Sequence, residues 1–304
     1  MPQDHEAELA ELLKEVRRIE VQSNRLVTEM MAGAYSSVFR GTGIEFDEVR
    51  EYADGDDPRR VDWNVTARMG RPYIKKYVDE RELTVIFLLD LSASMSGGFG
   101  LWSARQMAAR ICACLALSAV KNKDKAGLIA FSEDVDKYVP PEKGISHVLR
   151  IIRDCLILPG KSPYTNLAPA LEFTSRVLTR RSVIFLVSDF LAPGWQEALT
   201  LCARRHDLVA VRLLPPELTP PVAGLMRLCD PESGEVRVVD WKNPDVRVAY
   251  MERVAHWQTQ TADLLRRARV DLMEVPVPRE YDKEAVSRPI ADFFRMRSHR
   301  GARR

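Results

Sequence analysis

Thr84-Val-Ile-Phe-Leu-Leu-Asp90 is a continuous apolar run that is too short for a helix of usual length and that ends in a carboxylate. A run of this kind predicts a central strand that is buried on both faces, as in a parallel sheet. The next residues, Leu91-Ser92-Ala93-Ser94, supply two hydroxyls directly behind that carboxylate. This one stretch therefore predicts both a central strand and polar groups at its carboxyl end.

Strand-like and helical segments alternate along the chain after this run. Further strands are expected at residues 126–131, from the turn at 133–136 to residue 139, and at 182–188, 208–213 and 270–275. Helices are expected between them at residues 102–120, 145–156, 167–178, 195–204 and 244–269. Such alternation predicts an α/β fold with a doubly wound, mainly parallel sheet and helices on both faces.

The remaining segments surround this sheet. Residues 1–33 place apolar residues mostly three and four apart, which predicts an amphipathic helix, and residues 34–81 form a polar extension that is broken up by glycine and proline. The sheet domain is expected at 82–280, with a hairpin insertion at 223–241. Residues 281–304 are expected to form a terminal helix and a basic tail.

The overall composition argues against membrane and nucleic-acid partners. The 304 residues contain 45 basic and 43 acidic side chains, so no bulk charge favours a polyanion, although terminal arginines alone could engage phosphates non-specifically. No stretch reaches the roughly 18 apolar residues of a membrane-spanning helix, and no signal peptide is evident, so a cytoplasmic protein is expected. Buried reduced thiols are expected at Cys112, Cys114, Cys155, Cys202 and Cys229.

Oxygen-bearing side chains gather at the predicted carboxyl ends of the strands, where open α/β sheets bind their ligands. They come from three loops and are Asp90, Ser92, Ser94, Thr165 and Asp189. Hard oxygen ligands suit Mg²⁺ or Mn²⁺. Because the hydroxyls are neutral, a cation held by them stays incompletely neutralised and attracts a carboxylate from another protein. Polar loops that only cap their own backbone, with no metal, are the alternative.

The order Asp-x-Ser-x-Ser, then a distant threonine, then a distant aspartate resembles the metal-ion-dependent adhesion site of von Willebrand factor A domains. This resemblance implies a von Willebrand factor A-like fold, in which Ser92, Ser94 and Thr165 would bind the cation directly. Asp90 and Asp189 would bind it directly or through water. The chain departs from similar proteins at Asn166, where they commonly have an aspartate, and this removes one negative charge from beside the site.

A wider resemblance covers the segment from Glu45-Phe-Asp-Glu-Val-Arg50 to Asp62-Trp63-Asn-Val-Thr-Ala67-Arg68. This segment, ahead of the metal-site strand, resembles the signature of domain-of-unknown-function family 58 (DUF58). Those proteins are bacterial and archaeal and are often linked with MoxR-type AAA+ ATPases. The resemblance implies a chaperone-like cytoplasmic adaptor that helps a MoxR-type ATPase to mature or activate client complexes, and that binds an acidic residue of the client.

The extension itself leaves two interpretations open. The aspartates Asp54, Asp56 and Asp57 lack the spacing of a calcium loop, so a tight turn is favoured. The second question concerns Trp63 and its charged neighbours Arg59, Arg60, Asp62 and Arg68. They form either a partner-facing patch or a set that docks the extension through Trp63, and docking is favoured.

An enzyme is the main alternative function, specifically a magnesium-dependent phosphatase-like hydrolase of the haloacid-dehalogenase type. Such enzymes need a second aspartate two residues after the first as a general acid, and this chain has Ser92 in that place. The familiar nucleotide-binding, serine-hydrolase and metalloprotease motifs are also missing from the sequence. The sequence therefore favours a binding protein without catalytic activity.

Overall fold

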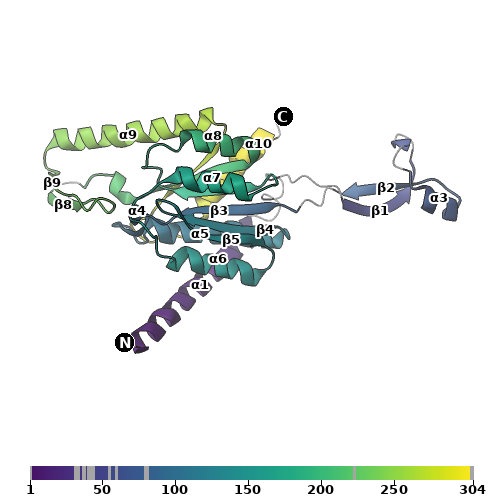
Figure 1. Cartoon of the computed structure of the whole chain (residues 1–304), viewed down its shortest axis with the longest axis horizontal. Helices are drawn as coiled ribbons and strands as arrows, with labels where there is room; N and C mark the ends of the chain where they lie inside the picture. Colours follow the sequence, from purple (N-terminus) through teal and green to yellow (C-terminus); the bar gives the residue numbers. More distant parts are fainter. Residues whose placement is uncertain are drawn as a thin grey trace. The chain divides into compact units, whose positions relative to one another are not determined.

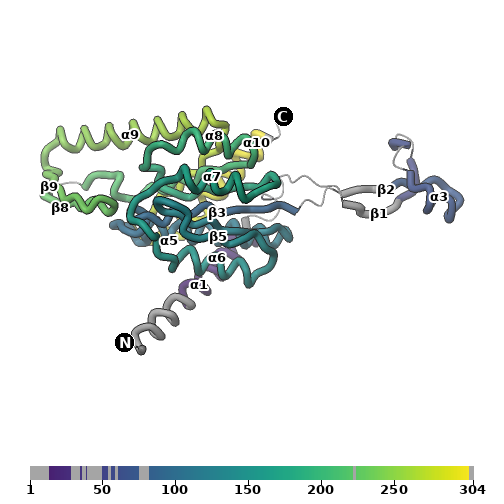
Figure 2. The backbone as a smooth tube through the Cα atoms, in the orientation of Figure 1, coloured from purple at the N-terminus to yellow at the C-terminus, as the bar shows by residue number. Residues whose placement is uncertain are grey.

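The computed structural model describes residues 2–30, 35, 39, 45–53, 56–58, 61–78, 82–221 and 224–301. Figure 2 traces the backbone of the chain. The chain divides into two compact units. The sheet unit comprises Met1–Val38 and Thr84–Arg304, and the extension unit comprises Phe39–Leu83.

A six-stranded sheet forms the centre of the sheet unit, with the strand order β10-β7-β6-β3-β4-β5. Its strands are β3 (Thr84–Asp90), β4 (Lys125–Phe131), β5 (Val135–Glu142), β6 (Val183–Ser188), β7 (Asp207–Leu214) and β10 (Asp271–Pro276). All neighbouring strands run parallel except β5, which pairs with β4 in the antiparallel direction. The chain order reverses at β3, so the sheet is doubly wound and the predicted von Willebrand factor A-like α/β fold is confirmed.

Helices cover both faces of this sheet (Figure 1). They are α1 (Pro2–Met30), α4 (Ala93–Ser96), α5 (Ala104–Lys121), α6 (Ile145–Ile157), α7 (Leu167–Val177), α8 (Gln196–Arg205), α9 (Pro244–Arg267) and α10 (Ser287–Gly301). On one face, α5 and α6 pack against the strands and α1 packs on those two helices; α7, α8 and α9 lie on the other face. A short 3₁₀ helix, η2 (Pro216–Leu218), follows β7.

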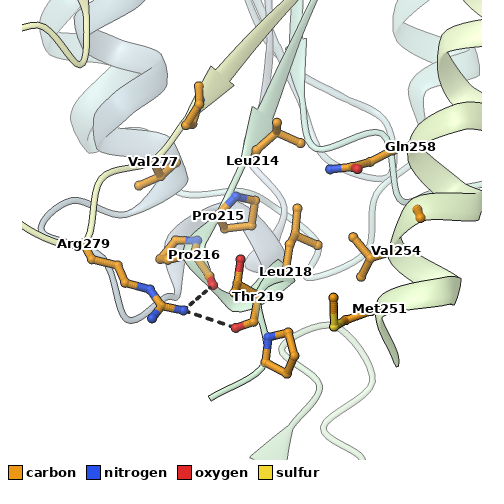
Figure 3. A pocket seen from close by; sticks show the side chains of 13 residues that line it. Leu214, Pro215, Pro216, Leu218, Thr219, Met251, Val254, Gln258, Val277 and Arg279 are labelled. Carbon is orange, nitrogen blue, oxygen red and sulfur yellow. Dashed lines mark hydrogen bonds between the residues drawn. The ribbon is translucent and has the colours of Figure 1, made fainter. Parts of the chain in front are cut away.

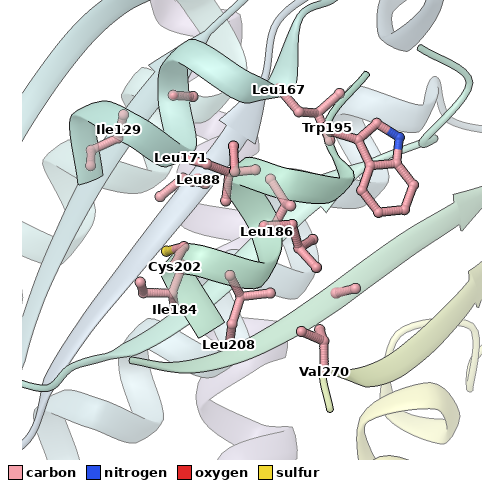
Figure 4. Close-up of a cluster of buried hydrophobic side chains, with 14 of the residues drawn as sticks. Leu88, Ile129, Leu167, Leu171, Ile184, Leu186, Trp195, Cys202, Leu208 and Val270 are labelled. Carbon is pink, nitrogen blue, oxygen red and sulfur yellow. The ribbon is translucent and has the colours of Figure 1, made fainter. Parts of the chain in front are cut away.

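The central strand β3 is held by apolar packing on both faces. Six of its seven residues are buried, as the apolar run predicts. Phe87 stacks on Phe185 of β6 with ring centroids 5.8 Å apart, whereas Ile86 and Leu88 belong to the cluster on the opposite face. Figure 4 shows that cluster, in which α7 and α8 pack on the strands. This packing fixes the position of Asp90 at the end of β3.

The extension unit contains β1 (Glu45–Glu51), α3 (Trp63–Met69) and β2 (Tyr73–Val78), with β1 and β2 antiparallel. Asp62 caps the first turn of α3 by accepting from the backbone N–H groups of Asn64 and Val65. Trp63 keeps 73% of its surface exposed, so it does not anchor the fold of its own unit.

Asp56 holds a turn of the extension unit. Its carboxylate accepts two hydrogen bonds from Arg50, at 2.6 and 2.8 Å, and one from the backbone N–H of Ala53 at 2.8 Å. The pKa of Asp56 is lowered, first by the Arg50 hydrogen bonds. These bonds agree with the tight-turn interpretation; Asp54, Arg59 and Arg60 lie outside the described residues.

Two sequence expectations need correction in the sheet unit. Cys229 is exposed, because it lies on the outer hairpin, whereas the other four cysteines are buried thiols as expected. The terminal helix begins at Ser287, several residues inside the expected segment 281–304, and continues to Gly301. Its arginines are engaged within the chain: Arg297 pairs with Asp207 and Asp271, at 2.7 and 2.9 Å. Among the described residues, no helix is long and apolar enough to cross a bilayer.

Candidate metal centre

The carboxylate of Asp90 ends β3 and is completely buried. Its Oδ1 accepts the backbone N–H of Ser92 at 2.9 Å, and its Oδ2 accepts the hydroxyl of Ser188 at 2.6 Å. Ser188 is the last residue of the neighbouring parallel strand β6. The two strands therefore deliver a carboxylate and the hydroxyl that holds it to the same edge of the sheet.

A chain of hydroxyls joins the loop after β3 to the loop after β6. Ser94 donates to Oδ2 of Asp189 at 2.7 Å, and the hydroxyls of Ser92 and Ser94 lie 3.1 Å apart. Because the hydrogen of Ser94 goes to Asp189, the hydrogen of Ser92 can go either to Ser94 or to the carboxylate of Asp90. Lone pairs on both serine oxygens therefore stay available to a cation.

The backbone beside Asp189 has an unusual conformation. Phe190 has a φ of 59°, which places a bulky residue in the left-handed region. Its ring is buried edge-to-face against Trp195, its N–H donates to Ser188 Oγ, and its carbonyl accepts from the indole of Trp257 at 3.2 Å. Strained conformations of this kind persist where the surrounding structure holds them, and here they fix the direction of Asp189.

The loop that carries Thr165 is fixed against the loop after β3. The backbone N–H of Ala93 donates to the carbonyl of Pro163 at 3.0 Å. A Cβ on Gly160 would lie 2.5 Å from the carbonyl oxygen of Leu91, so only glycine allows this approach. Asn166 caps α7 by accepting from the N–H of Ala168. Thr165 therefore enters the site from a third, well-anchored loop.

Thr165 contacts a carboxylate that no sequence pattern indicates. Its hydroxyl donates to Oε1 of Glu232 at 2.6 Å, across 67 residues of sequence. Glu232 lies at the tip of the hairpin formed by β8 (Leu225–Cys229) and β9 (Val236–Asp240). Among the described residues, no hydrogen bond joins Thr165 to the two serines or the two aspartates of the site. The hydrogen-bond partner of its hydroxyl is Glu232.

The electrostatics of the site favour a cation. Burial, and then the charge of Asp189, raise the pKa of Asp90 to about 7. Burial also raises the pKa of Asp189; hydrogen bonds from Leu191 N–H and the Ser94 hydroxyl oppose this shift, and the charge of Glu232 adds to it. Within the described ranges, neither of these buried carboxylates forms an ion pair with a basic side chain, and a divalent cation would supply the missing positive charge.

The donor set fits a hard divalent cation. The side chains offer carboxylate and hydroxyl oxygens, which Mg²⁺ and Mn²⁺ accept. In the described part of the chain, no group of three or more histidine, cysteine, aspartate or glutamate side chains is arranged to hold a metal ion. A cation at this site would therefore depend on the serine and threonine hydroxyls as well as on the carboxylates.

Sequence reasoning missed Ser188, Gly160 and Glu232. Ser188 directly precedes Asp189 at a strand end, so its position was a usable signal. Gly160, a glycine ahead of the loop that carries Thr165, was a weaker signal. Glu232 lies in a turn whose direction depends on how the hairpin packs, and no local pattern reveals that.

A separate pocket of about 500 Å³ lies at the carboxyl ends of β7 and β10 (Figure 3). Its lining is mostly apolar, with Met251 and Val254 of α9 on one side. Arg279, the charged residue of the lining, donates to the carbonyls of Pro216 and Thr219 at 2.9 and 3.2 Å. None of the five predicted site residues lines this pocket, and its lining has no acid, histidine or cysteine for acid–base chemistry.

The chain matches the family described as "Protein of unknown function DUF58" over residues 48–260, which is more than half of its length. It therefore belongs to the DUF58 family. The uncharacterized protein Rv1480 of Mycobacterium tuberculosis is 27% identical over 275 residues, covering 89% of this chain and 86% of the relative.

Solved structures with a similar shape are more distant. The conserved hypothetical protein BatB from Bacteroides thetaiotaomicron is 15% identical with a TM-score of 0.42, covering 71% of this chain and 99% of BatB. The SpRpn10 VWA domain is 10% identical with a TM-score of 0.40, covering 69% of this chain and 94% of that domain. The strand order described above, and not these distant matches, establishes the fold.

Proposed function

We propose that this protein is a non-catalytic adaptor, and that a divalent cation at Asp90, Ser92, Ser94, Thr165 and Asp189 binds a carboxylate of a partner protein. The observation that carries the proposal is the chain of contacts from Ser92 through Ser94 to Asp189, next to the buried Asp90. When bound, Mg²⁺ or Mn²⁺ supplies a Lewis-acidic charge that attracts a carboxylate. The residues of the chain hold that charge at the edge of the sheet.

Exposed apolar side chains beside the site support a protein partner. Tyr164, next to Thr165, is 50% exposed, and Leu191, two residues after Asp189, is 53% exposed. Large apolar groups around a polar centre are typical of surfaces that bind other proteins. A partner that presents an acidic residue within an apolar segment would match both features.

The partners are proposed from the DUF58 family alone. A MoxR-type AAA+ ATPase is the proposed co-acting machine, and the proposed client is a protein complex that the ATPase matures or activates. Both would meet the adaptor in the cytoplasm. This part of the proposal rests on family analogy and on no contact in the molecule.

Ser92 supports the non-catalytic role. Two residues after the strand-end aspartate, a phosphatase of the haloacid-dehalogenase type places a proton-donating aspartate. Here the serine hydroxyl faces Ser94 at 3.1 Å and takes part in the hydroxyl chain. Asp90-dependent hydrolysis of a phosphate ester in Mg²⁺ would contradict the non-catalytic proposal.

The experiment is an affinity purification from native lysate with mass spectrometry. Wild type in Mg²⁺, wild type in EDTA, and Asp90→Ala in Mg²⁺ are compared, with Asp263→Ala as a control at an exposed aspartate that pairs with Arg266 on α9. Partners are expected with wild type and Asp263→Ala in Mg²⁺, and not in the other two samples. If the same partners persist in all four samples, the proposed site does not bind them.

A further inference from the structure

The tip of the β8–β9 hairpin brings a third carboxylate to the candidate metal centre. Glu232 Oε1 accepts the hydroxyl of Thr165 at 2.6 Å, and the charge of Glu232 acts on Asp189. The hydrogen bond joins the hairpin to the loop that carries Thr165, and the charge of Glu232 reaches the loop after β6 electrostatically. The partner binding proposed above assigns no role to Glu232.

The turn that carries Glu232 is ordered by its own hydrogen bonds. Oδ1 of Asp230 accepts the N–H groups of Glu232 and Ser233, at 2.9 and 3.2 Å. The N–H of Gly234 donates to the carbonyl of Asp230 at 2.9 Å, with Gly234 in the left-handed region at a φ of 72°. These bonds fix the backbone of the turn, and the hydrogen bond from Thr165 orients the carboxylate of Glu232. The approach to Thr165 therefore does not depend on a freely rotating loop tip.

The direction of the hydrogen bond suits a cation at the site. A hydroxyl has one hydrogen and two lone pairs. Because Thr165 gives its hydrogen to Glu232, its lone pairs stay free, as do those of Ser94, which donates to Asp189. The two carboxylates thus orient the hydroxyls in the same way, each taking the hydrogen and leaving the oxygen to a metal.

We infer that Glu232 is the chain's own carboxylate ligand of the candidate metal centre and that it occupies the place of the partner's carboxylate. The inference rests on the proposed function, because it needs a cation at the site. Asp90 and Asp189 offer two negative charges to a divalent cation, and Glu232 offers a third. In the described part of the chain these carboxylates are not by themselves arranged to hold a metal ion. Together with the hydroxyls of Ser94 and Thr165 they complete the site from within, so a partner must displace Glu232.

The attachment of the hairpin permits such displacement. A cavity of about 730 Å³ separates the hairpin from α9, lined by Leu228 and Val239 on the hairpin and by Val246 and Tyr250 on the helix. Leu225 and Val238 are exposed, at 72% and 63%, so these hairpin residues do not pack into the sheet unit. In Figure 1 the hairpin and α4 lie at the same end of the sheet unit.

The test uses Mn²⁺ as the metal and acetate as the free carboxylate, with the chain of 304 residues. Wild type is compared with Glu232→Gln, which keeps the shape and removes the charge, and with Glu235→Gln. Glu235 is the matched control, because it lies on the same hairpin and pairs with Arg237 instead of the site. Titration calorimetry gives the Mn²⁺ affinity, and water-proton relaxation reports how many water molecules the bound Mn²⁺ carries.

Glu232→Gln is expected to weaken Mn²⁺ binding about tenfold, the usual scale for losing one supporting group of a metal site. The Mn²⁺ that does bind should relax water more strongly than in wild type, and acetate should suppress this relaxation at lower concentration. Glu235→Gln should match wild type. Equal Mn²⁺ affinity and equal acetate response in all three proteins would overturn the inference.

An Asp90→Ala arm separates the two levels of the proposal. If wild type binds Mn²⁺, Asp90→Ala does not, and Glu232→Gln is unchanged, the role of Glu232 is wrong while the metal centre stands. If wild type itself binds no Mn²⁺, the proposed function and the inference both fail. Support requires that both variants weaken Mn²⁺ binding and that only Glu232→Gln increases the acetate response.

Discussion

The hydroxyl of Ser188 donates to Oδ2 of Asp90 at 2.6 Å, joining the ends of two neighbouring strands. The same hydroxyl oxygen accepts the N–H of Phe190 at 3.1 Å. Both Ser188 and Asp90 are fully buried, and a buried carboxylate is costly without donors. Ser188 thus holds Asp90 together with the backbone N–H and the side chain of Ser92.

Ser188→Ala should destabilise the metal-free protein by about 1–3 kcal/mol, because it leaves one oxygen of Asp90 buried without its donor. Urea unfolding in EDTA, followed by circular dichroism, measures the free energy of unfolding. The control is Thr200→Ala, which removes a half-buried hydroxyl that donates to the carbonyl of Gln196. The control should change stability by no more than about 0.5 kcal/mol. A Ser188→Ala variant as stable as wild type would contradict the assigned role.

The sequence predicted the central sheet because each of its strands is marked by a local pattern, a short apolar run. The run that ends at Asp90 and the run that ends at Ser188 are both apolar and short, so their carboxyl ends and the following oxygen ligands could be placed without coordinates. Parallel pairing of these two strands then brings Asp90 and Asp189 to one edge. Four of the five candidate ligands are connected in this way, through Ser92 N–H and through the Ser94 hydroxyl.

The sequence could not place contacts that depend on how distant segments pack. Glu232 reaches Thr165 only because the hairpin folds back over the strand ends, and neither segment contains a periodic signal for this. The closeness of Gly160 to Leu91 is likewise a property of two loops in contact. The short helix α4 (Ala93–Ser96) forms from a segment that the sequence indicated only as a polar loop.

Gly160→Ala should distort the loop that carries Thr165. The added methyl would lie 2.5 Å from the carbonyl oxygen of Leu91, so the backbone of one loop must move, at a cost of about 1–3 kcal/mol. Gly97→Ala is a matched control, because a methyl there meets nothing within 4 Å. Urea unfolding and Mn²⁺ titration calorimetry of both variants check this. Gly160→Ala should lower both the free energy of unfolding and the Mn²⁺ affinity. If it behaves no differently from Gly97→Ala, the close approach of Gly160 to the Leu91 carbonyl is refuted.

His206 should make stability depend on pH. Burial, and then the positive charges of Arg205 and Arg181, lower the pKa of His206 below its usual 6.5. In the unfolded chain the pKa of His206 is about 6.5, so just below that pH the histidine binds a proton in the unfolded state but not in the folded state. The contribution of His206 is therefore fully present above pH 6.5 and is lost as the pH falls from 6.5 toward the lowered pKa.

The check on His206 compares wild type with His206→Asn, whose amide oxygen can still accept the N–H of Ser182 that meets Nδ1 of His206 at 3.4 Å. Melting temperatures are measured at several pH values between about 8 and 5, a range that includes the usual pKa of histidine. Wild type should lose more stability than the variant on acidification, by at most about 1.4 kcal/mol per pH unit. Parallel curves for the two proteins would rule out a lowered pKa.

Two substitutions of Asn166 distinguish its role as a helix cap from the effect of charge on the metal centre. Its side chain accepts the N–H of Ala168 at 3.2 Å at the start of α7, directly after Thr165. Asn166→Asp keeps this cap and places a negative charge at a helix N-terminus, which should add about 0.3–1 kcal/mol to stability. Asn166→Ala removes the cap and should cost about 0.5–2 kcal/mol.

The two Asn166 variants should also differ in Mn²⁺ affinity. A charge beside Thr165 favours a cation, so Asn166→Asp should bind Mn²⁺ more tightly than wild type, whereas Asn166→Ala loses only the anchoring of the loop and should bind it more weakly. Thermal unfolding in EDTA and calorimetric titration with Mn²⁺ give the two quantities separately. If Asn166→Asp gains stability but binds Mn²⁺ no better than wild type, residue 166 caps α7 without contributing to the electrostatics of the metal centre.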